Sequence, residues 1–453
     1  MRNFPERRAV EQAAFFMIER AKKKGASAAD VLYTFNTGHS ISLLDGEPEK
    51  ISGGFSLGIG LRTLDSKGRQ GVAHVNSIDR NILEEVVEWS VANCASAEPD
   101  PDVVLAEPTA LQSSDLELSD DAILNITPDE RLAFCKEMWS AAKSADPRVA
   151  SVRSASWGDG AGEVLYVSSA GMVGWYEGAS AGCGVSVVLS SGETMEMGGY
   201  GDESRLLSSL SPRSVALQAV GRTALILGGE PLPTGRYDLV LDAESASSFI
   251  EVLGELFLSS NIHKNKSFLK GTLGKKVASG VLTLVDDGIL KGGIATAPFD
   301  GEGVPCSRTC LLSKGVVQSW LYNLKYARID GVRSTGNAGR SVAGVPDVDS
   351  SNLSLLPGKW TPEDLLIQVG NGIYVTELLG LHTINPVSGE FSLGIKGACI
   401  RGGEIGPPVA GMTVAGNLKD VLQSIDLVGN DFKYFGSIGS CSLVIRDVAA
   451  AGI

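Results

Sequence analysis

The chain has 453 residues, of which 43% are hydrophobic and 20% are charged, a combination typical of a soluble globular protein with two or three domains. Its formal net charge of −14 disfavours contact with the phosphate backbone of nucleic acids, and the sequence contains no basic cluster that would offset this repulsion. It also contains no run of about eighteen apolar residues, so we expect no membrane-spanning helix.

The first part of the chain alternates between helical and strand-like patterns. Apolar residues at the spacing of one helical face predict a helix over residues 7–23, and a second helix should follow Ser77, its expected N-cap. Between these helices, alternating runs bounded by turn residues predict four strands, at residues 30–35, 40–44, 54–63 and 71–75. We therefore expect a unit of helix, four strands and helix over residues 1–96.

The same order of elements returns downstream. Thr127, Pro128 and Glu130 form the pattern of a capping box and predict a helix over residues 128–144. A second helix should begin at Ser211, and the residues in between predict four strands, at 149–157, 163–168, 174–189 and 194–201. We infer a structural duplication, with a central unit at residues 120–230 and a linker rich in Pro, Asp and Glu at residues 97–119.

The pattern of predicted elements changes in residues 235–453, where short strands and glycine-rich turns are the most frequent. Helices are expected over residues 243–258 and 319–327 and after Thr361. Many non-local strands with few long helices predict a β-rich mixed C-terminal domain. The predicted fold class is therefore α+β: duplicated helix–four-strand–helix N-terminal units, followed by this domain.

Several segments of the C-terminal domain resemble signature segments of the TldD/PmbA (TldE) family, to which the label "modulator of DNA gyrase" is also attached. The clearest are Asn-Pro-Val-Ser-Gly-Glu-Phe-Ser-Leu-Gly-Ile-Lys-Gly at 385–397 and Ser-Thr-Gly-Asn-Ala-Gly-Arg at 334–340. The others lie at residues 285–288, 299–305, 376–380, 411–418 and 428–431. Turns of this kind are common singly, but their order over some 150 residues makes the resemblance specific. It implies membership of a metallopeptidase family.

The resemblance also implies where a metal would be bound. The active, TldD-like subunit carries His-Glu-x-x-x-His on a helix, a spacing that directs two imidazoles to one metal ion. The corresponding segment here is 250–255, where Ile250 and Glu255 replace the histidines and Glu251 remains. Cys441 lies where the TldD pattern has a ligand cysteine, but we interpret it as a turn residue before the last strand. We therefore expect no metal and no catalytic residue in this chain, and zinc in a partner subunit.

The segments of the resemblance contain the candidate peptide-binding residues. Amide and guanidinium groups could bind a peptide backbone or carboxylate. The alternative is that Gly-Asn pairs only provide left-handed turn geometry. The candidates are Thr335, Gly336, Asn337, Arg340, Asn385 and Asn417, with His382 and Glu251 as further residues of a possible cleft.

The resemblance is closest to the metal-free TldE/PmbA side of the family. It implies a subunit of a two-component metallopeptidase that acts on unfolded peptides, paired with a TldD-like subunit in a heterodimer or with itself. Two alternatives stay open. One is a self-contained homodimeric peptidase that uses Cys441, His382 and Glu251, and the other is a non-enzymatic regulatory binding protein. The cysteine count is odd, no Cys-x-x-Cys pair is present and residues 1–8 lack an apolar signal-peptide core, so we expect a cytoplasmic protein.

Overall fold

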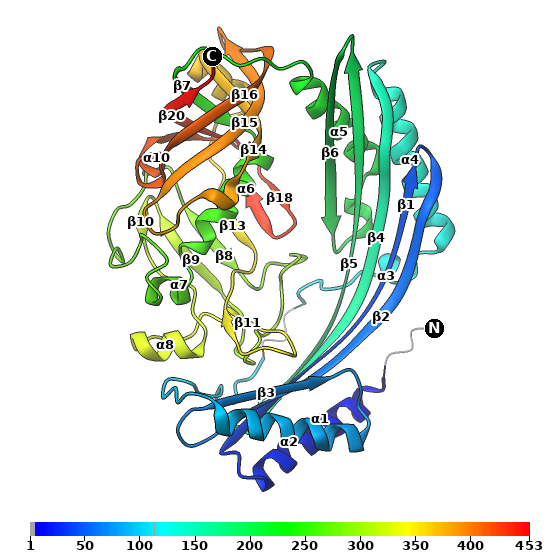
Figure 1. Ribbon diagram of the computed structural model, residues 1–453, viewed down its shortest axis with the longest axis vertical. Helices are drawn as coiled ribbons and strands as arrows, with labels where there is room; N and C mark the ends of the chain where they lie inside the picture. Colours follow the sequence, from blue (N-terminus) through cyan, green and yellow to red (C-terminus); the bar gives the residue numbers. More distant parts are fainter. Residues whose placement is uncertain (1–4, 112–114) are drawn as a thin grey trace.

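The computed structural model describes residues 5–111 and 115–453 of the chain (Figure 1). Residues 1–4, which entered the signal-peptide prediction, and residues 112–114 of the predicted linker lie outside this description. The described part combines a long curved sheet, covered by helices on its outer side, with a C-terminal part that faces the inner side of that sheet (Figure 1). The predicted mixed fold, with sheets in both the N-terminal and the C-terminal region, is confirmed.

The N-terminal sheet is built from two copies of one arrangement. The first copy consists of α1 (Arg7–Lys23), β1 (Ala28–Leu44), β2 (Glu47–Leu64), β3 (Gln70–Val75) and α2 (Arg80–Ser96). The second consists of α4 (Pro128–Ala145), β4 (Val149–Ser168), β5 (Val173–Ser191), β6 (Thr194–Ser204) and α5 (Pro212–Ile226), preceded by the short α3 (Asp121–Leu124). Antiparallel pairing of β1 with β4 joins the copies into one six-stranded sheet of order β3-β2-β1-β4-β5-β6. The predicted domain boundaries stay a prediction.

Each copy contains three strands, so the prediction of four was wrong. The sequence-based breaks at Gly38 and around Gly160 are positions where one strand continues, because Gly38 pairs with Gly160 in the middle of the β1–β4 ladder. Glycine weakens an isolated strand, but a glycine with paired neighbours on both sides keeps its place in the sheet. The N-cap of α2 is Asp79 instead of Ser77, and its carboxylate accepts a hydrogen bond from the Asn81 amide.

Alternation along the strands separates the two faces of this sheet. Odd-numbered residues of β1 and β5, and of β4 from Ala155 on, point to the outer helices, since Tyr33 packs under α1 and α2 while Trp157 and Val185 pack under α4 and α5. Even-numbered residues of the same stretches point to the inner side. The outer face thus holds two hydrophobic cores, and the inner face is left for contact with the C-terminal part.

The C-terminal part contains two more six-stranded sheets, of order β16-β15-β14-β7-β20-β17 and β10-β9-β8-β13-β19-β18, and a two-stranded pair β11-β12. Its strands are β7 (Gly235–Leu241), β8 (Leu284–Asp287), β9 (Arg308–Ser313), β10 (Val316–Val317), β11 (Ala338–Gly339), β12 (Asp347–Val348), β13 (Leu353–Leu355), β14 (Asn371–Leu379), β15 (Glu390–Arg401), β16 (Glu404–Asn417), β17 (Ile425–Val428), β18 (Lys433–Phe435), β19 (Ile438–Ser440) and β20 (Leu443–Ala451).

The helices of this part are α6 (Ala243–Glu255), α7 (Ser259–His263), α8 (Leu324–Asp330), α9 (Pro362–Val369) and α10 (Leu418–Ser424), and the chain also has the 3₁₀ turns η1 (Leu207–Ser209) and η2 (Leu381–Thr383). Helix α6 packs Phe249, Ile250 and Leu253 into the largest hydrophobic core, which strands of both sheets share. It is therefore a central, buried support of the C-terminal part. Among the described residues, no helix is long and apolar enough to cross a membrane.

Candidate functional site

A cleft of about 780 Å³ lies between the inner face of the N-terminal sheet and the C-terminal part. Its floor comes from the middle of β1, β4 and β5 and from the end of β6, and its opposite wall comes from α6 and the turn between β18 and β19. Figure 1 shows the two parts of the molecule on either side of this region. The volume of the cleft exceeds that of four other hollows, which measure about 250–480 Å³.

The floor of the cleft consists of glycine and serine residues. They occupy the inward-facing positions of neighbouring strands, and the register places them opposite one another: Gly158 pairs with Gly182, and Gly184 pairs with Gly201. Because these positions carry little or no side chain, a bound chain can approach the sheet closely. The residues concerned are Gly38, Ser40, Ser156, Gly158, Gly160, Ser180, Gly182, Gly184 and Gly201.

The opposite wall brings a few larger side chains toward this floor. Phe435 and Gly436 come from the β18–β19 turn, and Glu244 comes from the first turn of α6. Burial raises the pKa of Glu244, and the guanidinium of Arg222 opposes this effect. Asp202 and Glu203, at the end of β6, add further carboxylates at the rim of the cleft.

At one end of the cleft, α5 and β6 hold the C-terminal part. The Arg222 guanidinium forms ion pairs with Asp242 and Glu244 and donates a hydrogen bond to the Thr376 carbonyl. Asp242 is also the N-cap of α6, since its carboxylate accepts from the Ser245 amide at 2.8 Å. This end of α6 is therefore fixed to α5 through one arginine.

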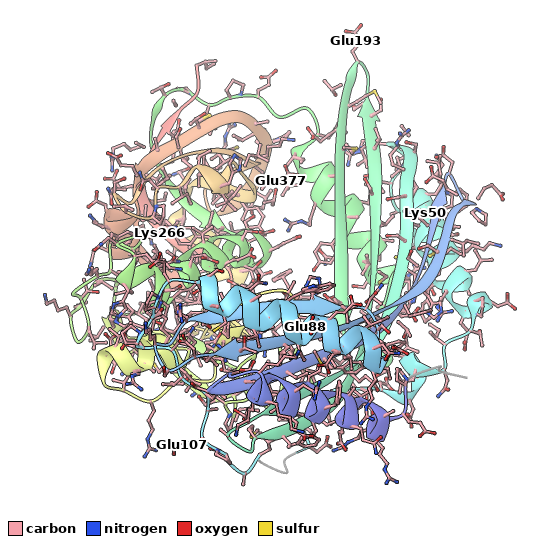
Figure 2. All side chains as sticks on the ribbon, turned by 60° about the horizontal axis from the view of Figure 1, so that its bottom comes forward. Lys50, Glu88, Glu107, Glu193, Lys266 and Glu377 are labelled. Carbon is pink, nitrogen blue, oxygen red and sulfur yellow. The ribbon has the colours of Figure 1, made fainter. Side chains whose placement is uncertain are left out.

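A second contact at the same end involves Lys396 on β15. Its ammonium lies 2.8 Å from Glu196 on β6 and 3.6 Å from Glu377 on β14. Figure 2 shows Glu377 on the side of the C-terminal part that faces α5 and the N-terminal strands. These charged side chains attach the rim of the C-terminal part to the edge of the sheet.

At the other end, a buried charge cluster attaches the C-terminal part to β1 and β2. The Asp30 carboxylate accepts hydrogen bonds from Arg340 at 2.8 Å, from the Arg62 Nε at 3.0 Å and from the Tyr166 hydroxyl at 3.1 Å. Burial alone would raise the pKa of Asp30, but the two guanidinium groups outweigh it and lower the pKa. Glu302 lies 3.7 Å from Arg62 and completes the cluster. The side chains of Asp30, Arg62, Glu302 and Arg340 are at most 4% exposed.

Four of the predicted peptide-binding residues lie in this attachment. The Thr335 hydroxyl bonds to the backbone of Tyr322, Gly336 has a positive φ of 76°, and Asn337 donates to Asp286 at 2.8 Å. With the Arg340–Asp30 pair, these contacts give the segment a structural role. Contact of Thr335, Gly336, Asn337 and Arg340 with peptide stays a prediction. Gly336, Asn337 and Arg340 line a smaller hollow of about 270 Å³, and the Asn337 Oδ1 and Arg340 Nη2 atoms have no hydrogen-bond partner among the described residues.

The other two candidate amides are engaged in their own loop. The Asn385 Oδ1 accepts from the amides of Val387 and Ser388, and the Asn417 side chain donates to the Ser388 carbonyl while capping α10. These are the contacts expected of turn and cap residues. His382, on η2, and Glu251, on α6, are exposed and are not among the residues that line the central cleft.

The residues near α6 do not fit a zinc ion. Ile250 is completely buried in the hydrophobic core, and Cys441 is buried as well. Burial raises the pKa of the Cys441 thiol to about 12, so the thiolate that would bind zinc is disfavoured. Within residues 5–111 and 115–453, no group of three or more His, Cys, Asp or Glu side chains is placed to hold a metal ion.

Sequence reasoning missed the residues that make the cleft. Glu244 and Phe435, which line the cleft, lie far apart in the chain and carry no motif, and only the tertiary structure brings them together. The same holds for Arg222, which pairs with Glu244, and for Lys433, which pairs with Asp202. The one signal in the sequence was the alternation of glycine and serine in the long strands, which resembled a series of strand breaks.

Three family models match most of the chain. Residues 29–94 match domain 1 of the PmbA/TldA metallopeptidases, residues 121–227 match their central domain, and residues 234–452 match their C-terminal domain. The chain is 28% identical over 452 residues to the metalloprotease PmbA of Escherichia coli O157:H7, which covers 99% of this chain and 97% of that protein.

Solved structures share the fold over nearly the whole chain. A Thermotoga maritima protein whose name links it to modulation of DNA gyrase has a TM-score of 0.89 at 24% identity, covering 98% of this chain and 100% of that one. TldE from Thermococcus kodakarensis has a TM-score of 0.87 at 22% identity, with coverage of 98% and 100%. At these identities, the likeness shows the fold alone.

Proposed function

This chain belongs to the PmbA/TldD metallopeptidase family, and from this membership we propose that it is the metal-free, TldE-like subunit of a two-component peptidase that acts on unfolded peptides. In this proposal a TldD-like partner binds the zinc ion and carries out hydrolysis. The present chain closes the site and holds the peptide. The name TldE belongs to the structural relative, and its role is transferred here as a hypothesis.

The observation that carries the proposal is the make-up of the central cleft. Its volume of about 780 Å³ accommodates an extended peptide segment. Its lining includes one imidazole (His39), one thiol (Cys183) and four carboxylates (Asp159, Asp202, Glu203 and Glu244), but among the described residues no three side chains of these types come together to hold a metal ion. Zinc peptidases need three protein ligands from His, Cys, Asp or Glu in one place. The cleft therefore suits peptide binding better than metal-dependent hydrolysis by this chain alone.

The proposal includes a cytoplasmic location and excludes direct binding to nucleic acid. All seven cysteines are free, which fits a reducing compartment. The formal net charge of −14 would repel a phosphate backbone. Both statements can be checked on the purified protein and in cell fractions.

The test compares the chain alone with the chain co-expressed with a His-Glu-x-x-x-His relative from the same genome. Zinc content by mass spectrometry and hydrolysis of an unfolded reporter peptide, with and without chelator, are measured on both samples. We expect the isolated chain to contain no stoichiometric zinc and no chelator-sensitive activity, and the complex to have both. Changing the two motif histidines of the partner to alanine should abolish zinc binding and activity without separating the subunits.

The opposite result would favour a self-contained homodimeric peptidase. Stoichiometric zinc and chelator-sensitive hydrolysis by the isolated chain would contradict the proposal directly. The observed positions of Cys441, buried with a raised pKa, and of His382 and Glu251, exposed on other elements, give that alternative little support. A non-enzymatic regulatory role would instead require retention of a regulatory target such as DNA gyrase by the isolated chain.

A further inference from the structure

The turn between β18 and β19 reaches from the C-terminal part toward the N-terminal sheet (Figure 1). The two strands pair antiparallel, with Phe435 opposite Ile438, and Gly436 at the turn has a positive φ of 61°. Phe435 and Gly436 line the central cleft, together with the glycine positions of β5 and β6. The hairpin thus places one aromatic side chain across the cleft from a floor of very small residues.

The base of this hairpin is fixed to the sheet by Lys433. Its ammonium lies 2.8 Å from the Asp202 carboxylate and 3.0 Å from the Tyr200 hydroxyl, both on β6. The same ammonium lies over the rings of Tyr200, at 5.1 Å, and Phe435, at 5.6 Å. These contacts cross the edge of the cleft and fix the distance between the hairpin and the strands that form the floor.

Phe435 is the one large apolar side chain among the described residues that line the cleft. The others are glycine, serine, alanine, one histidine, one cysteine and carboxylates. Because Gly184 and Gly201 pair directly beneath this region, the floor presents backbone where most sheets would present side chains. An apolar side chain of a bound peptide would find its main apolar contact in the Phe435 ring.

We propose that Phe435 is a specificity-determining residue, which packs on an apolar side chain of an extended peptide held between the β18–β19 hairpin and the glycine floor. The cleft then favours unfolded segments with aromatic or aliphatic residues over polar segments of the same length and charge. This inference rests on the proposed peptide-binding function and adds its substrate preference. Lys433 is a positioning residue for Phe435.

The experiment uses two fluorescein-labelled peptides, each about ten residues long, a length that spans the strands of such a sheet. Both have the same Gly-Ser framework and the same charge, and they differ only in two central residues, which are Phe in one and Ser in the other. Fluorescence anisotropy gives the dissociation constant of each peptide for the isolated chain and for the complex with a TldD-like subunit.

We expect the wild-type protein to bind the Phe peptide about tenfold more tightly than the Ser peptide, and F435A to reduce this ratio to about twofold. F435L should keep most of the preference, because leucine still offers an apolar surface. K433A should weaken binding of the Phe peptide more than that of the Ser peptide. The matched control is F55A: Phe55 is 75% exposed, stacks on Phe35 and lines a different hollow on the outer side of the sheet.

The outcomes separate this inference from the function on which it rests. Equal affinity of the wild-type protein for both peptides, or an equal loss of preference in F435A and F55A, would overturn the role of Phe435 and leave peptide binding intact. Failure of both the isolated chain and the complex to bind either peptide would overturn the proposed function itself. Circular dichroism and the thermal midpoint of each variant confirm that the compared proteins are folded.

Discussion

The Arg340 side chain is fully buried where the segment 334–340 meets β1, and it shares the Asp30 carboxylate with Arg62. Asp30 comes from the N-terminal sheet and Arg340 from the C-terminal part, so the pair crosses the boundary between them. A buried carboxylate is stable as an anion only while its partners remain in place. Arg340 therefore affects the attachment of the two parts far more than a surface arginine would.

Replacing Arg340 with methionine should lower the free energy of unfolding by about 3–5 kcal/mol, because Asp30 loses one of its two cations while it stays buried. Urea unfolding followed by tryptophan fluorescence measures this loss. The matched control is R236M, since Arg236 pairs with Asp447 on the surface, where the two side chains are 60% and 70% exposed. That variant should change stability by less than about 1 kcal/mol. Equal effects of the two substitutions would show that the buried cluster contributes little to the attachment.

Among the elements, β2 contains two glycines in different surroundings. A Cβ atom on Gly60 would lie 1.8 Å from the Val342 carbonyl oxygen, whereas a Cβ atom on Gly54 would meet nothing within 4 Å. The chain after Arg340 thus packs directly on the backbone of β2. Contact this close is possible only without a side chain.

The G60A variant should be destabilised by about 1–3 kcal/mol or more, because the segment around Val342 must move away from the strand. The G54A variant should be neutral or more stable by up to about 1 kcal/mol, since alanine loses less backbone entropy in a strand than glycine does. Thermal unfolding compares the two, and limited proteolysis near residues 341–344 should be faster in G60A alone. The same stability in both variants would contradict the observed contact.

How far the elements can be predicted depends on the range of the interactions that define them. The starts of α4 and α5 were predictable because caps are local: Thr127 and Glu130 form the expected capping box of α4, and Ser211 caps α5. The helix predicted from residue 319 instead begins at Leu324, after the N-cap Asn323. The continuation of β1 through Gly38 was not predictable, because the pairing partner Gly160 lies far along the chain. The cleft could not be predicted for the same reason, since Phe435 lies near β6 only when the C-terminal part packs against the N-terminal sheet.

At the scale of the whole molecule, two attachments set the width of the cleft. Arg222 joins α5 to α6 at one end, and the cluster around Asp30 joins β1 and β2 to the C-terminal part at the other. The cleft of about 780 Å³ lies between these attachments, and Lys433 bridges its edge to β6. A change that loosens either end would therefore alter the space for a peptide without disturbing the hydrophobic cores.

The loop 299–305 next to the Asp30 cluster makes one of these attachments sensitive to pH. The Asp300 carboxylate accepts hydrogen bonds from the amides of Glu302, Val304 and Ala338, at 2.9–3.0 Å. Burial, followed by the neighbouring Glu302 carboxylate, raises the pKa of Asp300 to about 7. Burial also raises the pKa of Glu302, although the Arg62 guanidinium opposes it. The folded protein therefore retains a proton on this pair at pH values where the unfolded chain has released it.

The sign of the pH dependence follows from this difference. The stabilisation from the pair is complete below the unfolded-state pKa of Asp, near 4, and is lost as pH rises through the folded-state value of about 7. The wild-type thermal midpoint should accordingly fall between pH 5 and pH 8. In E302Q the like charge is gone, so the pKa of Asp300 should move down and the midpoint should fall less. The corresponding loss of unfolding free energy over this range should be smaller by about 1–2 kcal/mol.

The wild-type protein and E302Q differ at one residue only, so the difference between the two curves reports the carboxyl pair. Asp30 does not interfere, because its lowered pKa places its own loss of stabilisation below pH 4. Parallel curves for the wild-type protein and E302Q would mean that Asp300 and Glu302 are both ionised in the folded protein. The attachment beside the cleft would then have to balance two buried negative charges with Arg62 and Arg340, and it would not loosen as the pH rises.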